Sequence, residues 1–205
     1  MPAAVSCPIS PGPPGCKTGG MDPKAIPLTG QAEGDRERRA REFATAAHAR
    51  AGQRRKYTGE PYIEHPAAVV ALVRSVPHDE AMLCAAWLHD VIEDCGVTAD
   101  SIERNFGYDV AQLVVQITDV SKPSDGNRRA RKEIDRAHLA SACPRGKTIK
   151  IADVIHNVSS IAKADAEFAR VYVPEKALLL ELLAEGDATL LAQAWALIEE
   201  VQREN

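Results

Sequence analysis

Hydrophobic residues recur along most of the chain at the three- and four-residue intervals of amphipathic helices. The clearest case is the C-terminal stretch, where Leu190, Ala194, Leu197 and Val201 are spaced by four, three and four residues. Runs of β-branched and aromatic residues, which would indicate strands, are sparse. The pattern therefore predicts an all-α protein, folded as a compact helical bundle.

Two segments are more hydrophobic than an amphipathic surface helix. Nearly every residue from Ala81 to Leu88 is apolar, and the segment runs on into an acidic sequence that ends at Asp94. Residues 147–164 repeat this character, with apolar side chains stepping by three. A helix that is apolar on all sides is typical of the centre of a bundle. We therefore expect two buried helices, one of them continuous from 81 to 94.

Helix breakers and caps delimit the other elements. Gly52 is expected to end the first helix, and Gly59, Pro61 and Pro66 exclude a helix through the loop that follows. Thr98 is a candidate N-cap. These signals predict further helices over residues 35–51, 66–76, 98–106, 109–120 and 126–142, the last of them polar and exposed.

The first 30 residues differ from the rest of the chain. They are crowded with Pro and Gly and have no hydrophobic period. Such a composition buries too little apolar surface to offset the entropy of ordering. We expect a flexible tail over residues 1–30 and a single folded domain over residues 31–205.

Composition excludes several classes of protein. The net charge of −4 gives no global positive field for non-specific binding of nucleic acid. The five cysteines are odd in number and lack CxxC spacing, which argues against a disulfide scaffold. No apolar run approaches the ~18 residues of a membrane span, and the N-terminus does not resemble a signal peptide. We expect a soluble cytoplasmic protein whose partner is neither a nucleic acid nor a membrane; its oligomeric state is left open.

A polar cluster at the end of the first buried helix is the main candidate site. His89, Asp90, Glu93 and Asp94 lie within six residues, and on a continuous helix His89 would share a face with Glu93 and Asp90 with Asp94. Three carboxylates so close together repel one another unless a cation or water lies between them. The alternative is a capped, solvated helix end.

Asp153 favours the metal interpretation, because it lies in the apolar stretch IKIADVI and an unpaired buried carboxylate is costly. His65 offers another imidazole from a proline-bounded turn. A site formed by His65, His89, Asp90 and Asp153 would leave coordination positions open and would favour Mn²⁺, Fe²⁺ or Zn²⁺ over Ca²⁺. Glu93 and Asp94 would then be free to accept a proton from a metal-activated water.

Basic residues occur in two groups. Arg55 and Lys56 are joined to His65 by a short loop, so they are within reach of a polyphosphate on the metal, and a guanidinium can stack on a base. We interpret the second group as a solvated helix face, the usual role of a charge run. It consists of Arg128, Arg129, Arg131 and Lys132.

Three segments in order, RRKYTGEPYIEHP, AAWLHDVIEDC and KTIKIADVIHN, resemble the HD-domain (p)ppGpp hydrolases, the hydrolase half of RelA/SpoT proteins and their small single-domain relatives. The resemblance spans about residues 40–165 and implies an all-helical, Mn²⁺-dependent enzyme that removes the 3′-pyrophosphate of (p)ppGpp to give GDP or GTP. It implies one metal ion per chain and a role in the stringent response. By position it implies metal ligands at His65, His89, Asp90 and Asp153, catalytic acids at Glu93 and Asp94, and substrate contacts at Arg55, Lys56 and Asn157.

The chain departs from the family pattern at three positions. Cys95 stands where Thr is usual, Val154 where a basic residue is usual, and Ser159 where Arg is frequent. The last two concern substrate contacts, so guanine and adenine alarmones remain alternatives. Another HD-type phosphohydrolase, such as a nucleotidase or phosphodiesterase, and a non-catalytic helical binding module are the other hypotheses.

Overall fold

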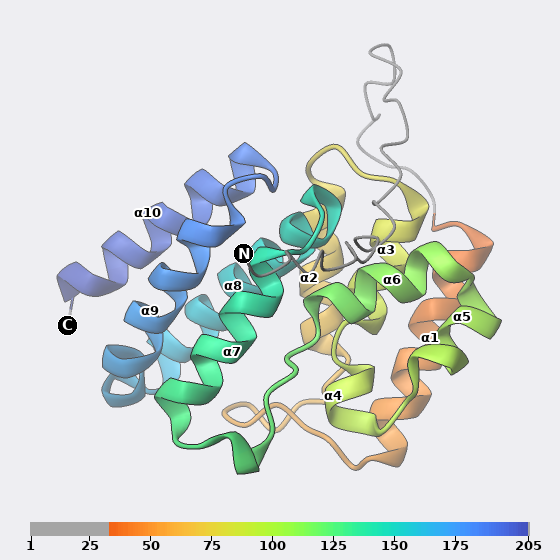
Figure 1. Cartoon of the computed structure of the whole chain (residues 1–205), viewed down its shortest axis with the longest axis horizontal. Coiled ribbons are helices and arrows are strands. Elements are labelled where there is room, and N and C mark those ends of the chain that lie inside the picture. Colours follow the sequence, from red (N-terminus) through yellow and green to blue (C-terminus); the bar gives the residue numbers. More distant parts are fainter. Residues whose placement is uncertain (1–32, 205) are drawn as a thin grey trace, which may run out of the picture.

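The computed structural model describes residues 33–204, so the predicted tail over residues 1–30 lies outside the described residues. The described part is helical and contains no β-strand; one isolated bridge joins Arg54 to Pro61. Figure 1 shows the arrangement. In chain order the elements are α1 (Asp35–Arg50), α2 (Glu64–Arg74), α3 (Glu80–Leu88), α4 (Val91–Cys95), α5 (Ala99–Phe106), α6 (Tyr108–Ile117), the 3₁₀ turn η1 (Pro123–Asp125), α7 (Arg128–Ala140), α8 (Pro144–Ala164), α9 (Ala166–Leu180), η2 (Glu181–Leu183) and α10 (Ala188–Glu204).

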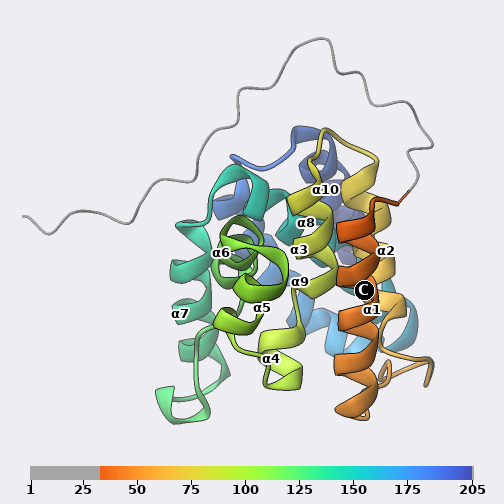
Figure 2. The ribbon, with the colours of Figure 1, turned by 90° about the vertical axis from the view of Figure 1, so that its right-hand side faces the viewer.

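The two helices at the centre of the bundle are those that the sequence predicts to be buried. Helix α3 packs against α1, α2, α6 and α8, and every residue from Ala81 to Leu88 is buried. Helix α8 packs against α2, α6, α9 and α10, and Figure 2 shows α3 and α8 enclosed by the other helices. Burial on most sides of these two helices explains why both are largely apolar. The prediction of an all-α bundle is confirmed.

The N-cap expected at Thr98 is present, and the structure adds caps at Asp79 and Gly96. The Thr98 side chain accepts a hydrogen bond from the backbone N–H of Ser101 and begins α5. The Asp79 carboxylate does the same for Met82 at the start of α3. Gly96 ends α4 in the left-handed region, with φ of 67°, where a residue without Cβ is favoured.

The prediction of one continuous helix from 81 to 94 is wrong. Helix α3 ends at Leu88, residues 89 and 90 form a turn, and the short helix α4 follows. The break turns His89 back toward α3, where its Nδ1 lies 2.8 Å from the carbonyl oxygen of Ala86. His89 and Glu93 therefore do not share one helix face, and the turn, rather than helical periodicity, determines where these side chains point.

The sequence pattern also misses α9. This helix contains Pro174, which cannot donate the backbone hydrogen bond of a helix interior and normally marks a helix end. Its buried residues nevertheless pack against α8 and α10, so tertiary contacts outweigh the local signal.

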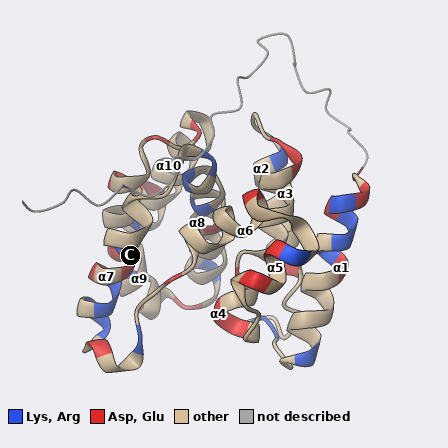
Figure 3. Ribbon diagram, turned by 45° about the vertical axis from the view of Figure 1, so that its right-hand side comes forward, with Lys and Arg blue, Asp and Glu red and all other residues tan. Residues whose placement is uncertain are grey.

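Charge is distributed unevenly over the described helices. Figure 3 shows basic residues along α7 and acidic residues on α4, both in the lower half of the view. No helix within residues 33–204 is both long and apolar enough to cross a lipid bilayer.

Candidate metal centre and active site

Three of the predicted metal ligands meet at the centre of the bundle. His65 lies on α2, while His89 and Asp90 form the turn between α3 and α4. The His65 Nε2 atom is 3.1 Å from His89 Nε2 and 3.4 Å from Asp90 Oδ2, and His89 Nε2 is 3.1 Å from the same carboxylate oxygen. One donor atom from each of the three residues lies within 4.8 Å of the others, which is close enough for a single ion.

Asp153 approaches the same place from α8. Its Oδ1 atom is 3.2 Å from His65 Nε2 and 3.9 Å from His89 Nε2. Asn157, one turn later, donates a hydrogen bond of 2.6 Å to the same oxygen. The other carboxylate oxygen, Oδ2, is 3.0 Å from the ammonium of Lys150. The structure thus brings together all four residues predicted as ligands.

Hydrogen bonds behind the two imidazoles determine which nitrogens face the site. Nδ1 of His89 donates to the Ala86 carbonyl, so Nε2 is the nitrogen that faces the carboxylates and can bind a metal once it is deprotonated. Nδ1 of His65 lies 2.7 Å from Nδ1 of His156. Burial, together with His65 and Arg55 nearby, lowers the pKa of His156 to about 4, so this imidazole is neutral and can accept a hydrogen bond from Nδ1 of His65. The arrangement prepares both Nε2 atoms as ligands.

The donor set fits a cation because it concentrates buried negative charge. Burial disfavours the charged form of His89, yet Asp90 and Asp153 beside it raise its pKa to about 9. The Asp90 carboxylate also accepts a hydrogen bond of 2.7 Å from the hydroxyl of Tyr62. Two imidazole nitrogens and two carboxylate oxygens suit Mn²⁺, Fe²⁺ or Zn²⁺ better than Ca²⁺, which takes six to eight oxygens.

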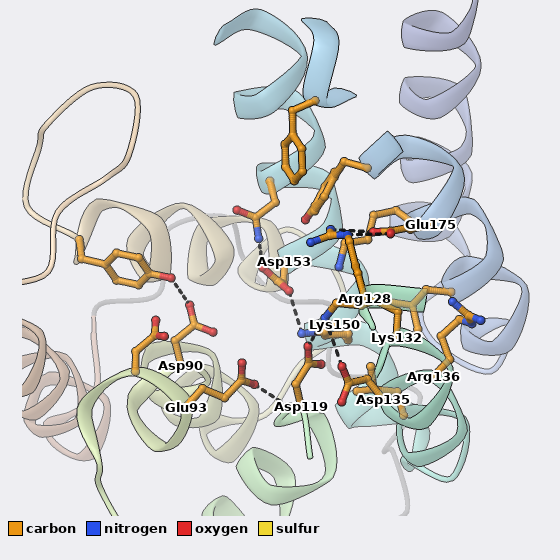
Figure 4. Close-up of a pocket in the computed structure, with 18 residues that line it drawn as sticks. Asp90, Glu93, Asp119, Arg128, Lys132, Asp135, Arg136, Lys150, Asp153 and Glu175 are labelled. Carbon is orange, nitrogen blue, oxygen red and sulfur yellow. Dashed lines mark hydrogen bonds and ion pairs between the residues drawn. The ribbon is translucent and has the colours of Figure 1, made fainter. Parts of the chain in front are cut away.

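A pocket of about 330 Å³ opens beside the donor atoms. Figure 4 shows that Asp90, Glu93 and Asp153 lie at one end and that Arg128, Lys132 and Arg136 lie across from them. Aromatic side chains from the loop before α2 and from α9 complete the wall; they are Tyr62, Phe168 and Tyr172. The pocket therefore has one end lined by candidate metal ligands and a cationic wall.

The two predicted catalytic acids line this pocket. Glu93 and Asp94 both project from α4. Although the Glu93 side chain is open to the pocket, the walls displace bulk water from around it and raise its pKa to about 7; Lys150 opposes this shift, whereas Asp119 and Asp90 add to it. The Oε1 atom of Glu93 accepts a hydrogen bond of 2.6 Å from the backbone N–H of Asp119. A carboxyl group with a pKa near 7 can exchange a proton at neutral pH.

The predicted substrate contacts occupy two places. Asn157 lines the pocket next to Asp153. Arg55 is not among the residues that line the pocket, but its guanidinium is 5.9 Å from the centre of the Tyr62 ring, which does line it, and 3.2 Å from the Ser160 hydroxyl. Lys56 has a side chain that is 73% exposed, and its ammonium is 5.4 Å from the Phe168 ring. Both basic residues therefore border aromatic groups of the pocket wall.

The interpretation of the second basic group as a solvated face is wrong for Arg128 and Lys132, which line the pocket. Lys132 pairs with Asp119 at 2.6 Å, and Arg128 forms two hydrogen bonds of 2.8 Å with Glu175. Arg129, in contrast, is exposed and away from the pocket. Helix α7 is polar on most sides, so its sequence carries no sign of which charges turn inward.

Sequence reasoning also missed several pocket residues on α7, α8 and α9. Lys150 is buried against Asp153, and its signal was available as a lysine within an apolar helix, three residues before a predicted ligand. Arg136 and Lys176 line the pocket without an ion pair to a carboxylate within residues 33–204. Burial and the charge of Lys150 lower the pKa of Lys176 to about 8. These two side chains are available to an anionic ligand.

Comparison with known proteins identifies the family. A family model described as an HD domain matches residues 40–184, a range that includes all nine predicted site residues, from Arg55 to Asn157. The chain belongs to the HD domain family. The resemblance seen in the three sequence motifs is thereby confirmed.

Curated relatives carry names of two kinds: some are guanosine-3′,5′-bis(diphosphate) 3′-pyrophosphohydrolases and others are GTP pyrophosphokinases or diphosphokinases. A probable guanosine-3′,5′-bis(diphosphate) 3′-pyrophosphohydrolase from Synechocystis is 40% identical over 133 residues, which cover 63% of this chain and 17% of the relative. The human guanosine-3′,5′-bis(diphosphate) 3′-pyrophosphohydrolase MESH1 is 34% identical over 62% of this chain and 70% of its own length. The mouse protein of the same name is 37% identical over 57% of this chain and 65% of its own length. This chain thus spans about a sixth of the length of the long relatives and about two thirds of the length of the short ones.

Solved structures agree with the fold. A structure described as a metazoan ortholog of SpoT that hydrolyses ppGpp has a TM-score of 0.72 and 26% identity, covering 85% of this chain and 98% of that one. The Listeria monocytogenes protein lmo0812 has a TM-score of 0.57 and 21% identity, covering 70% and 99%, and supports the fold alone.

Proposed function

We propose that this HD-domain protein is a metal-dependent pyrophosphohydrolase that removes the 3′-pyrophosphate of guanosine 3′,5′-bis(diphosphate). The observation that carries the proposal is the pocket itself, in which buried metal donors face a wall of cations across about 330 Å³. A polyphosphate whose scissile phosphorus lies at the metal and whose remaining charge meets the cations fits both ends. The names of the human, mouse and Synechocystis relatives support this substrate.

The proposed metal is a single Mn²⁺ ion, held by His65, His89, Asp90 and Asp153. When bound, it would supply Lewis-acid polarisation of a phosphate oxygen and a lower pKa for the attacking water. The imidazoles are held with Nε2 inward by Ala86 and His156, and Asp153 is oriented by Asn157 and Lys150. This preorganisation fixes the ligands before the substrate arrives.

The acids on α4 would handle the protons of the reaction. Water forms a bond to the phosphorus attached to the 3′ oxygen, the bond between that phosphorus and the 3′ oxygen breaks, and pyrophosphate leaves. Glu93 or Asp94 takes a proton from the water, and a proton returns to the 3′ oxygen, which becomes a hydroxyl. The raised pKa of Glu93 suits this exchange at neutral pH.

The cations of the pocket would bind the phosphates. Arg136 and Lys176 have no carboxylate partner within the described residues, and Lys132 presents its ammonium from α7. At the rim, Arg55 and Lys56 would contact the base and the outer phosphates, since both lie beside aromatic rings of the pocket. Asn157 would contact the substrate next to the metal.

Two alternatives share the same metal centre. One is a preference for adenosine alarmones, because Val154 is buried in the core and Ser159 replaces a frequent arginine. The other is a different phosphohydrolase activity, such as that of a nucleotidase or phosphodiesterase. A non-catalytic binding module would have no need of Glu93 with a pKa near 7 beside the donors.

The decisive experiment is a nucleotide panel with product analysis. Mn²⁺-loaded protein should convert ppGpp to GDP and pyrophosphate, and a chelator should abolish turnover. Release of orthophosphate would indicate a phosphatase. Faster turnover of ppApp than of ppGpp would indicate an adenine preference. The absence of metal-dependent turnover of any nucleotide would indicate a binding module. Under the proposal, the enzyme acts on a free nucleotide in the cytoplasm, as part of the stringent response, and needs neither nucleic acid nor membrane.

A further inference from the structure

Asp135 is a buried carboxylate on α7 with an unusual number of partners. Its side chain is 2% exposed. The Oδ1 atom accepts hydrogen bonds from the backbone N–H groups of Val120 and Ser121, at 3.1 and 2.9 Å. The Oδ2 atom accepts from the Ser121 hydroxyl at 3.0 Å and from the ammonium of Lys132 at 3.2 Å. One carboxylate therefore holds the segment that connects α6 to η1.

The same segment holds Glu93. The residue before Val120 is Asp119, whose backbone N–H donates the 2.6 Å hydrogen bond to Oε1 of Glu93. The Asp119 side chain is tied back to α7 by Lys132 at 2.6 Å. Figure 4 shows the part of this network that runs from Asp135 through Lys132 and Asp119 to Glu93. These contacts help to fix the Glu93 side chain, which stands on a helix of only five residues.

The ionised state of Asp135 supports its role as an anchor. Burial would raise its pKa, but the backbone hydrogen bond from Ser121 and the charge of Lys132 outweigh burial and hold the pKa below its usual range. A charged acceptor forms stronger hydrogen bonds to backbone N–H groups than a neutral one. The segment is thus fixed in the position that places the Asp119 N–H against Glu93.

We propose that Asp135 is a positioning residue for Glu93 and acts through the backbone of residues 119–121. The Asp135 carboxylate bonds to Val120 and Ser121, and the Lys132 ammonium pairs with Asp119. Together these contacts hold the Asp119 N–H that orients Glu93. The inference rests on the proposed proton-handling role of Glu93. It assigns to α7 a function in the geometry of the reaction that is distinct from any contact with phosphate.

The test compares Asp135→Ala with Asp135→Asn and with Glu133→Ala, which removes an exposed carboxylate from the same helix. We expect Asp135→Ala to lower kcat by about 10- to 100-fold, the usual effect of an outer partner of an active-site group, with KM and bound Mn²⁺ near normal. Asn keeps an acceptor for the two N–H groups and should restore most of the loss. Glu133→Ala should behave as wild type. A normal kcat in Asp135→Ala would overturn the proposal.

A second measurement does not depend on turnover. In a ¹H–¹⁵N spectrum the Asp119 amide, which donates to a carboxylate, should shift in both Glu93→Gln and Asp135→Ala but not in Glu133→Ala. If Asp135→Ala does not fold, Asp135→Ser replaces it, because its single hydroxyl lies on a shorter side chain. We expect the same shift of the Asp119 amide. An unmoved Asp119 resonance in a folded Asp135 variant would overturn the proposal.

The two hypotheses fail in different ways. Normal turnover by Glu93→Gln would refute the catalytic role of Glu93 and with it the positioning role. Slow turnover by Glu93→Gln beside normal turnover by Asp135→Ala would refute the positioning role alone. In the Glu93→Gln background, Asp135→Ala should cause no further fall in kcat, because Asp135 acts through the acid that is already missing; an additive fall would contradict the inference.

Discussion

The two ends of the pocket are built from opposite kinds of helix. The metal-binding end takes His65, His89 and Asp153 from apolar helices and the turn that ends one of them. The opposite wall takes Arg128, Lys132 and Arg136 from α7, which is polar on most of its surface. A charge on an apolar helix is costly and therefore informative, whereas a charge on a polar helix is the ordinary case. Function can be inferred from sequence at the first end and only from structure at the second.

Lys150 connects the two ends. It comes from the apolar helix α8 and pairs with the proposed ligand Asp153, yet its ammonium lies among the acids that face α7. The pair neutralises one carboxylate of the metal centre and leaves the remaining negative charge for a cation. Because Lys150 is fully buried, the loss of its charge would leave Asp153 uncompensated.

The largest effect should come from the ligands. We expect Asp153→Ala and His65→Ala to lose bound metal and to lower turnover on the order of 10³-fold or more, since metal polarisation is worth several kcal/mol. Metal analysis and kinetics of the same preparations provide the measurement. His138→Ala, which removes an imidazole bonded to the Val115 carbonyl outside the pocket, is the control. Wild-type metal stoichiometry in either ligand variant would refute the assignment.

Next in size are the acids on α4. Glu93→Gln and Asp94→Asn should keep their metal and lower kcat by on the order of 10²-fold or more. A base must be deprotonated, so kcat/KM of the metal-loaded wild type should fall along an acidic limb below about pH 7. Burial raises the pKa of Glu93 to about 7, and the charge of bound Mn²⁺ lowers it from there. The limb should vanish in Glu93→Gln; its persistence there would assign it to another group.

The cationic wall should affect binding more than chemistry. Arg136→Ala removes a pocket cation without a carboxylate partner in the described part of the chain, and we expect KM to rise about tenfold, as for the loss of one charged hydrogen bond. Arg129→Ala, an exposed arginine on the same helix, should leave KM unchanged. Equal effects of the two substitutions would show that α7 acts only through its overall charge.

A smaller effect is expected at the rim. Arg55→Ala and Lys56→Ala should mainly raise KM, by several-fold, because their charges are exposed or shared with aromatic rings. Steady-state kinetics would separate the effect on KM from any effect on kcat. A fall in kcat at unchanged KM would place these residues in the chemical step instead.

The smallest effect is predicted for the N-terminal residues. Deletion of residues 1–30 should leave kcat and KM within about twofold of the full chain, since all predicted site residues lie between Arg55 and Asn157. A large loss of activity with an intact helical signal by circular dichroism would show that these residues complete the site.

Much of the fold was predictable because its signals are local. Periodicity located the central helices, and the cap at Thr98 marked the start of α5. Two failures have physical causes. Pro174 hid α9, whose stability comes from packing against α8 and α10. The break after Leu88 interrupted a segment whose composition favours a helix throughout, because His89 turns back to bond with Ala86.

From the sequence alone we could infer that this chain is a helical bundle with costly polar groups on its apolar helices, and hence which residues are candidate ligands and acids. The distances between those groups, the nitrogens of His65 and His89 that face inward, and the cations of α7 that turn toward them became known from the folded chain. The reason is that the cost of burying a charge can be estimated from its neighbours in sequence. Which partners offset that cost depends on the fold, as for Asp153 on α8, which lies 3.2 Å from Nε2 of His65 on α2.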